Sequence, residues 1–318
     1  LKATNVVVLT VLYSRFQRTF LRLFWIFVSL NIFQILLDFL IVKFLACIII
    51  PHLCDTISTR GKKMLTSKGY IIQLETLMQQ KQAMPGAKEL IQAFRMENIS
   101  YLILTEHSSV TVDDILNQLE SCGIHGVKKE NIYTSTMAAV EYIVTHDKKA
   151  IDVDYIGGKG IRQVLTDTGF HITHHNPQYF FVGMDSSLSY DEYQDVFTQL
   201  RKGSQLVSVD HRRIQMVDQV EKIGNGTIVR MLEYAAGVKA MNFGCGTKIL
   251  LKFASTHLPY SLSETIMIGN RFKKDIVPAL QLGMLTFYVA GSEEMMKQGI
   301  NDELHPDYIL DDLTGLLR

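Results

Sequence analysis

Short apolar runs alternate with segments of helical periodicity along most of the chain after residue 64. Four runs have no polar alternation, and they lie at residues 70–74, 101–105, 265–269 and 284–289. Such runs are typical of parallel strands that are buried on both faces. Residues 112–123 have acidic residues at the start and glycine at the end, as helices prefer. The pattern predicts an α/β fold with a Rossmann-like, doubly wound parallel sheet.

Residues 140–238 carry a second alternation of the same kind. Strand-like runs lie at 150–156, 179–184 and 205–209, and helix-like segments lie at 160–168 and 190–202. We therefore expect a smaller α/β unit that is inserted into the main domain. The predicted division is an N-terminal segment at 1–63, a first part of the main domain at 64–139, the inserted unit at 140–238 and a second part of the main domain at 239–318.

The segment before residue 64 has a different character. Residues 20–53 are nearly all apolar, and a membrane-spanning helix needs ~20 such residues. Asp38 and Lys43 interrupt the run, and each costs roughly 2.5–3.5 kcal/mol at the bilayer centre. We favour the reading that residues 1–63 are upstream sequence added by an over-extended reading frame, because Met64 opens a short polar step before the first strand. The alternative is a native membrane anchor formed by residues 20–53.

Composition argues against several classes of partner. Hydrophobic residues make up 47% and charged residues 20%, and 32 basic residues balance 32 acidic ones. A net charge near zero gives no general attraction to nucleic acid. Four scattered cysteines lack the paired spacing of a metal site and fit a reduced, cytoplasmic protein. For His171, His174 and His175, solvated side chains at a strand edge are a better reading than a metal cluster.

Polar residues follow the predicted strands at the edge where ligands bind in parallel α/β sheets. The first strand leads into Gln73-Leu74-Glu75-Thr76-Leu77 and then into a helix that starts Pro85-Gly86-Ala87. The second strand ends at Thr105, and the third leads into Gly269-Asn270-Arg271-Phe272-Lys273-Lys274-Asp275. In these segments the chain resembles class IIA of the haloacid dehalogenase (HAD) superfamily. That branch contains sugar-phosphate, phosphoglycolate and 4-nitrophenyl phosphatases with a large α/β cap.

The resemblance implies a role for each position and shows which groups are replaced. The family's nucleophilic aspartate falls on Gln73, its acid/base aspartate on Glu75, its phosphate-binding threonine on Thr105 and its lysine on Cys245. Attack on phosphorus needs an anionic carboxylate, which an amide cannot supply. Glu75 keeps the carboxyl group but adds a methylene, and a misplacement of about 1 Å can cost ~10²-fold in rate.

The metal site implied by the resemblance is degenerate as well. Relatives bind Mg²⁺, which prefers carboxylate oxygens, through motifs that correspond to Gln73, Asn270 and Asp275. Two of the expected carboxylates are amides here, so we expect magnesium binding to be weak or absent.

Substrate contacts are predicted at Thr105, Glu106, Arg212 and Arg213. Thr105 offers a hydroxyl group to a phosphate, whereas Glu106 adds a like charge beside it. Arg212 and Arg213 lie in the loop after the third strand of the inserted unit, and their planar donor forks suit phosphate. A solvated, charged loop is the simpler reading of the two arginines.

These replacements fall on charged catalytic positions, while the apolar strands and helix starts around them are kept. The sequence therefore predicts a protein of the phosphatase family that is inactive or severely impaired. We expect it to bind a phosphorylated small molecule or a protein partner, and a homodimer is possible by analogy with relatives. The alternative is a magnesium-dependent phosphatase of small phosphorylated metabolites with an altered mechanism.

Overall fold

The chain divides into two units, residues 1–63 and 64–318. The computed structural model describes residues 68–217, 220–290 and 304–317, all of which belong to the second unit. No helix among these residues is long and apolar enough to cross a membrane. The predicted anchor at residues 20–53 lies outside the described residues.

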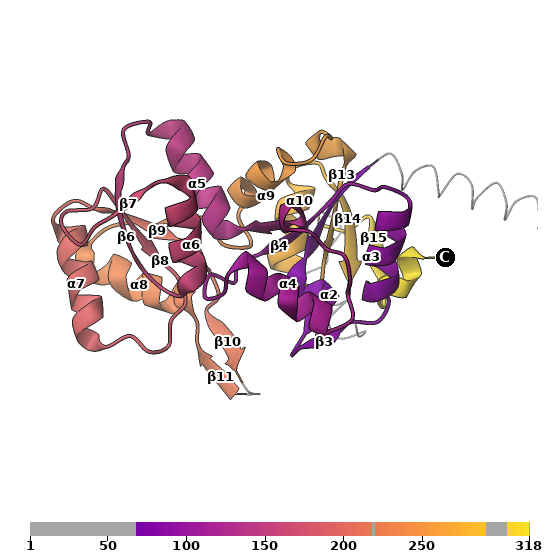
Figure 1. Ribbon diagram of the computed structural model, residues 1–318, viewed down its shortest axis with the longest axis horizontal. Coiled ribbons are helices and arrows are strands. Elements are labelled where there is room, and N and C mark those ends of the chain that lie inside the picture. The colour runs from indigo at the N-terminus through magenta and orange to yellow at the C-terminus, as the bar shows by residue number, and fades with distance from the viewer. Residues whose placement is uncertain (1–67, 218–219, 291–303, 318) are drawn as a thin grey trace, which may run out of the picture. The chain divides into compact units, whose positions relative to one another are not determined.

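The main domain is built on a six-stranded sheet in which every neighbouring pair is parallel. Its order is β15-β14-β13-β1-β4-β5 (Figure 1). The strands are β1 (Gly69–Gln73), β4 (Tyr101–Thr105), β5 (Ile132–Thr134), β13 (Thr265–Gly269), β14 (Leu285–Val289) and β15 (Tyr308–Leu310). The four predicted strands are confirmed, and β4 and β13 match residue for residue. The short strands β5 and β15 at the two edges were not predicted.

The central strands are buried on both faces, as their continuous apolar runs require. In β1, Ile71 packs in one hydrophobic cluster, whereas Tyr70 and Ile72 pack in another. The first cluster includes residues of α5 (Ser135–His146), α9 (Lys248–Ser255) and α10 (Val277–Leu280), and the second includes residues of α3 (Ala87–Met96) and α4 (Val112–Ser121). This two-sided burial confirms the doubly wound α/β fold.

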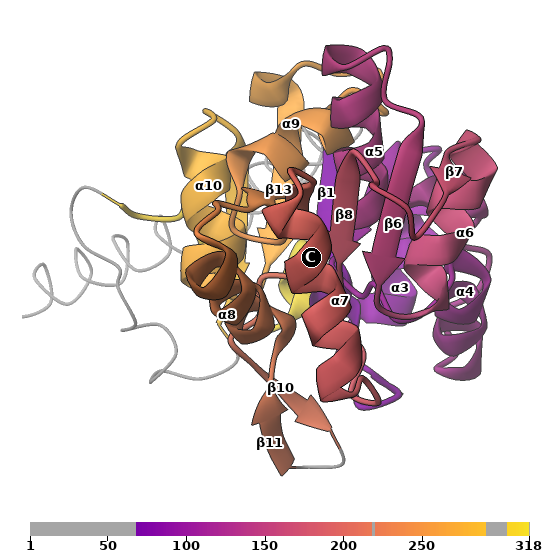
Figure 2. The same cartoon turned by 90° about the vertical axis from the view of Figure 1, so that its left-hand side faces the viewer.

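The inserted unit contains a second parallel sheet in the order β12-β9-β8-β6-β7. Strands β8, β6 and β7 of this sheet are labelled in Figure 2. Its strands are β6 (Asp152–Ile156), β7 (His171–Ile172), β8 (Tyr179–Val182), β9 (Gln205–Ser208) and β12 (Met241–Asn242). Its helices are α6 (Lys159–Thr168), α7 (Tyr190–Arg201) and α8 (Asn225–Ala236). The inserted unit was predicted at residues 140–238. Strand β12 lies after the second of these bounds, and α5 spans the first. The domain boundaries themselves stay predictions.

Helix starts in both sheets follow local polar signals. Thr111 and Asp114 form a capping box at the start of α4, and Ser189 and Glu192 form another at the start of α7. The remaining small elements are α2 (Leu74–Leu77), the hairpins β2–β3 (Met78–Gln79 and Gln82–Ala83) and β10–β11 (Ile214–Val217 and Val220–Ile223), the 3₁₀ turns at Lys129–Asn131, Leu262–Glu264 and Leu313–Leu316, and a π-helical turn at Phe272–Ile276.

Candidate functional site

The predicted site residues meet at the carboxyl ends of the main-sheet strands. Gln73 ends β1 and is fully buried. Its Nε2 donates to Oε2 of Glu75 at 2.7 Å and lies 3.5 Å from Sγ of Cys245. The sequence resemblance placed these three residues together, and the structure brings them into direct contact.

Glu75 is held as a carboxylate by cationic and hydrogen-bonding neighbours. Oε1 of Glu75 lies 3.0 Å from Nε2 of His107. Burial alone would raise the pKa of Glu75, but the hydrogen bond with His107 and the charge of Arg271 outweigh it and hold the pKa well below its usual range. At neutral pH this group therefore carries no proton for a leaving group, which is what a general acid must deliver.

The thiol at the lysine position is neutral. Cys245 is fully buried, and burial together with the nearby Glu106 carboxylate raises the pKa of its thiol well above the usual value. A neutral thiol does not stabilise developing negative charge as an ammonium group does. Lys274 brings an ammonium group to the same network, and its Nζ lies 3.8 Å from Oε1 of Glu106.

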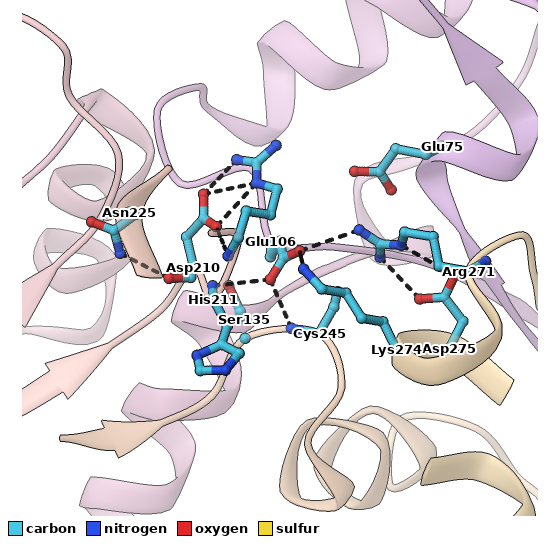
Figure 3. A network of polar contacts seen from close by, with 12 residues as sticks. Glu75, Glu106, Ser135, Asp210, His211, Asn225, Cys245, Arg271, Lys274 and Asp275 are labelled. Atoms are coloured by element: carbon cyan, nitrogen blue, oxygen red, sulfur yellow. Dashed lines mark hydrogen bonds and ion pairs between the residues drawn. The ribbon is translucent and has the colours of Figure 1, made fainter. Parts of the chain in front are cut away.

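Glu106 occupies the middle of a polar network that joins three chain segments (Figure 3). Its side chain is fully buried. Oε2 accepts hydrogen bonds from the backbone N–H of Cys245 at 2.9 Å and of His211 at 3.2 Å. Oε1 pairs with Nη1 of Arg271 at 3.3 Å and with Lys274. Burial and the charge of Asp210 raise the pKa of Glu106, while all four of these partners are donors or cations and so fit the ionised form.

Gly244 allows the loop before Cys245 to approach Glu106 closely. A Cβ atom at this position would lie 2.9 Å from Oε2 of Glu106 and 2.7 Å from the backbone nitrogen of His211. Both distances are shorter than side-chain contacts allow, and the second is to backbone. The glycine is therefore part of how the carboxylate of Glu106 is enclosed.

One of the two predicted magnesium ligands, Asp275, is bound by an arginine. Asp275 is buried and accepts from the backbone nitrogen and Nε of Arg271 through Oδ2, at 2.9 and 3.3 Å, and from Nη2 through Oδ1 at 2.9 Å. Asn270 donates from Nδ2 to the carbonyl oxygen of Glu75 at 3.2 Å, and its Oδ1 is buried without a hydrogen-bond partner. The π-helical turn at Phe272–Ile276 follows directly, and such turns occur often at functional sites.

These residues do not fit a divalent cation. Mg²⁺ needs several hard oxygen ligands in near-octahedral order, usually with one or two carboxylates. Of the two predicted ligands Asn270 and Asp275, Asn270 has an unpaired Oδ1 atom, whereas the carboxylate of Asp275 is bound to a guanidinium group. No group of three or more His, Cys, Asp or Glu side chains in the described part of the chain could hold a metal ion.

The predicted substrate contacts are only partly assembled. Thr105 is buried, and its Oγ1 accepts from the backbone nitrogen of His107 at 3.1 Å. Arg212 directs its fork at the buried Asp210, with Nε 3.0 and 3.1 Å from the two carboxylate oxygens, and its Nη1 lies 3.4 Å from Nε2 of His107. Arg213 is exposed, as the solvated-loop reading expected. A role for these residues in substrate binding stays a prediction.

Several residues of the network were not singled out from the sequence, among them His107, Asp210, His211, Arg271 and Lys274. Arg271 and Lys274 carried a readable signal, because they place positive charge between the two positions predicted to bind a metal. His107 and Asp210 carried none, since their roles depend on contacts between distant segments. The three histidines at 171, 174 and 175 form no metal group with described residues, and His171 and His174 pair with Asp152 and Asp154.

Comparison with known proteins places this geometry in a family. Residues 75–171 match a family described as haloacid dehalogenase-like hydrolase, and residues 243–316 match one described as HAD-hydrolase-like. The chain belongs to the haloacid dehalogenase superfamily. The first match runs into the inserted α/β unit as far as His171, and the second begins after β12. The rest of the inserted unit lies between the two matches, where class IIA members of the superfamily carry their cap.

Relatives within the HAD superfamily cover the described unit almost end to end. The 5'-nucleotidase YutF of Bacillus subtilis is 27% identical over 252 residues, which are 79% of this chain and 98% of that protein. The acid sugar phosphatase of Staphylococcus aureus is 25% identical over 249 residues, or 78% and 95%. A thermostable NPPase from Geobacillus stearothermophilus has a TM-score of 0.70 at 25% identity, with 78% and 97% covered. NagD from Escherichia coli K-12 shares the fold with a TM-score of 0.71 at 22% identity, with 78% and 97% covered.

Proposed function

We propose that this HAD-superfamily chain has no phosphatase activity and acts by binding a protein partner. The observation that carries the first half of the proposal is the amide of Gln73 at the buried end of β1. Covalent phosphoryl transfer to a carboxyl group needs an anionic oxygen in line with phosphorus. Gln73 has no such oxygen, and its amide is engaged with Glu75 and Cys245.

Three further features support the absence of catalysis. The carboxyl group of Glu75 is unprotonated and bound to His107, the thiol of Cys245 is neutral, and Arg271 lies among the predicted metal ligands. For phosphatase activity, other groups would have to take over the roles of the nucleophile, the general acid, the charge-stabilising lysine and the metal ion. The names of the relatives favour the alternative, which is a phosphatase with an altered mechanism in which Glu75 or water attacks the phosphorus atom.

The choice of a protein partner over a phosphorylated small molecule rests on the donors in the cleft. The guanidinium group of Arg212 is bound to Asp210, and that of Arg271 is bound to Asp275 and Glu106. A phosphate would have to displace these internal partners. The hairpin β10–β11 does present apolar side chains to solvent, and grouped exposed apolar residues are typical of protein contacts. Ile214, Met216 and Ile223 lie on one face of the hairpin, and Val220 lies on the other.

Restoration of the missing groups tests the catalytic half. The full chain is assayed with Mg²⁺ on sugar phosphates and nitrophenyl phosphate, beside the triple variant Gln73→Asp, Cys245→Lys and Asn270→Asp. The proposal predicts no turnover by the wild type. Turnover by the wild type above the protein-free control would reject the proposal, because the replaced groups would then be dispensable.

A further inference from the structure

Glu106 is surrounded as a bound oxyanion would be. Two backbone N–H groups, one guanidinium group and one ammonium group converge on a single buried carboxylate. The four donors come from the loop after β9, the loop after β12 and the segment after β13, so they are not local partners of Glu106 in sequence. Convergent donors of this type form anion sites in proteins, and hydrogen bonds to a charged acceptor are the strong ones.

Arg271 is surrounded as a bound cation would be. Its Nε and Nη2 donate to Asp275, and its Nη1 donates to Glu106, so one guanidinium group joins two buried carboxylates. The charges of Asp275 and Glu75 raise its pKa further, although burial opposes this. The group therefore remains a cation at all ordinary pH values.

We infer that the cleft is occupied by ligands from its own chain, with the Glu106 carboxylate in an anion site and the Arg271 guanidinium in place of a divalent cation. Without the Glu106 side chain, its four donors would bind a tetrahedral oxyanion such as a phosphate or a phosphomonoester. The Glu106 carboxylate occupies this anion site and so prevents that binding. This inference goes beyond the proposed function, because a cleft that is filled in this way would exclude phosphate whether or not a nucleophile were present.

The pairing of charges in the cleft supports exclusion. The carboxylates of Glu75, Glu106, Asp210 and Asp275 already lie against donors, namely His107, Arg212, Arg271 and Lys274. His211 offers no further positive charge, since burial and the charge of Lys274 lower its pKa. An incoming phosphate would therefore meet donors that already have a partner. Loss of the Glu106 carboxylate would free four donors together.

The same carboxylate links the inserted unit to the main domain. Glu106 follows β4 of the main sheet, and His211, which donates to it, follows β9 of the second sheet. Nearby, the hydroxyl of Ser108 accepts from the backbone nitrogen of Met184 at 3.1 Å, and the hydroxyl of Ser135 donates to the carbonyl of Val209. The internal ligand thus belongs to a set of contacts that joins the two sheets.

Titration of the full chain with inorganic phosphate at constant ionic strength tests the inference, with isothermal calorimetry as the readout. The variant Glu106→Ala empties the site, whereas the matched variant Glu106→Gln removes the charge but still fills the space. We expect phosphate to bind Glu106→Ala at least about tenfold more tightly than it binds the wild type or Glu106→Gln. Addition of Mg²⁺ should leave the unfolding temperature of the wild type unchanged.

Two results would overturn the inference. One is a folded Glu106→Ala protein that binds phosphate no better than the wild type, with folding checked by circular dichroism. The other is phosphate binding by the wild type itself, with or without Mg²⁺. If Glu106→Ala does not fold, the wild-type titration alone decides, and absence of binding upholds the inference. Neither result depends on turnover, so failure here is distinct from failure of the proposed function.

Discussion

Replacement of Arg271 by leucine should destabilise the described unit through two buried carboxylates. The variant keeps the size of the aliphatic stem but removes the guanidinium group. Asp275, 1% exposed, would lose two of its three hydrogen bonds and keep the one from the backbone nitrogen of residue 271. Glu106, 0% exposed, would lose one cationic partner and keep Lys274 with two backbone donors.

The expected loss is about 3 kcal/mol of the free energy of unfolding. Removal of one partner from a buried ion pair typically costs about 3–5 kcal/mol, because the remaining charge stays buried. We take the lower end, since the side chain of Arg271 is 26% exposed and both carboxylates keep other donors. For a unit of this size the loss corresponds to roughly 6–12 °C in the unfolding temperature.

Far-UV circular dichroism during urea and thermal unfolding is the suitable assay. It follows the helices and strands of the described unit, whereas the single tryptophan, Trp25, lies outside the described residues. Lys273→Leu is the matched control, because it removes a positive charge from an exposed position of the same segment and should change stability by less than about 0.5 kcal/mol. Adding Asp275→Asn to Arg271→Leu should recover part of the loss, since one buried charge is then removed.

Equal unfolding midpoints for Arg271→Leu, Lys273→Leu and the wild type would refute this reasoning. They would mean that Arg271 does not bridge the buried carboxylates, and the internal cation would then have no energetic role.

Three other predictions follow from the same contacts. The pKa of Glu75 is lowered in the folded protein, so its stabilising effect is complete above the unfolded pKa near 4.5 and is lost as the pH falls further. The difference in urea midpoint between wild type and Glu75→Gln should therefore shrink on acidification. A difference that stays constant with pH would contradict this prediction. Thr111→Ala should cost about 1 kcal/mol through loss of the α4 cap, and thermal unfolding would show it. Addition of Glu106→Ala to the triple restoration variant should raise its turnover of nitrophenyl phosphate, and no gain would argue against Glu106 as the obstruction.

The effect of Glu75 on the pH dependence of stability can be separated from that of other buried carboxyl groups only by comparison with Glu75→Gln. Burial raises the pKa values of Glu106 and Asp275, so these two groups favour the folded state as they become protonated on acidification. The effect of burial is common to both proteins and cancels in the difference. The charge of Glu75 also contributes to the raised pKa of Asp275, so the difference reports Glu75 together with its repulsion of Asp275.

The sequence was sufficient for the fold because its strands carry continuous apolar runs. β4 and β13 were predicted residue for residue, since both faces of each strand are buried and no other pattern accounts for such runs. The two edge strands, β5 and β15, are only three residues long and were not predicted. The hairpin β10–β11 was also missed, because its exposed side chains show no burial pattern.

The sequence predicted only those site residues that lie at strand ends or in the family motifs. Gln73, Glu75 and Cys245 could be placed together because each corresponds to a family position at one edge of the sheet. The partners of Glu106 could not be predicted, because His211, Cys245 and Arg271 belong to segments that are distant from it in the sequence. A charged residue read in isolation gives no indication that its counter-charges lie more than a hundred residues away.

Turnover of nitrophenyl phosphate by the full-length wild type, compared with Glu75→Gln in the presence of Mg²⁺, tests the central claim most directly. If the amide of Gln73 leaves the cleft without a nucleophile, both proteins should release nitrophenolate only at the rate of the protein-free control. Clear turnover by the wild type that Glu75→Gln abolishes would contradict the claim and identify Glu75 as a working catalytic group.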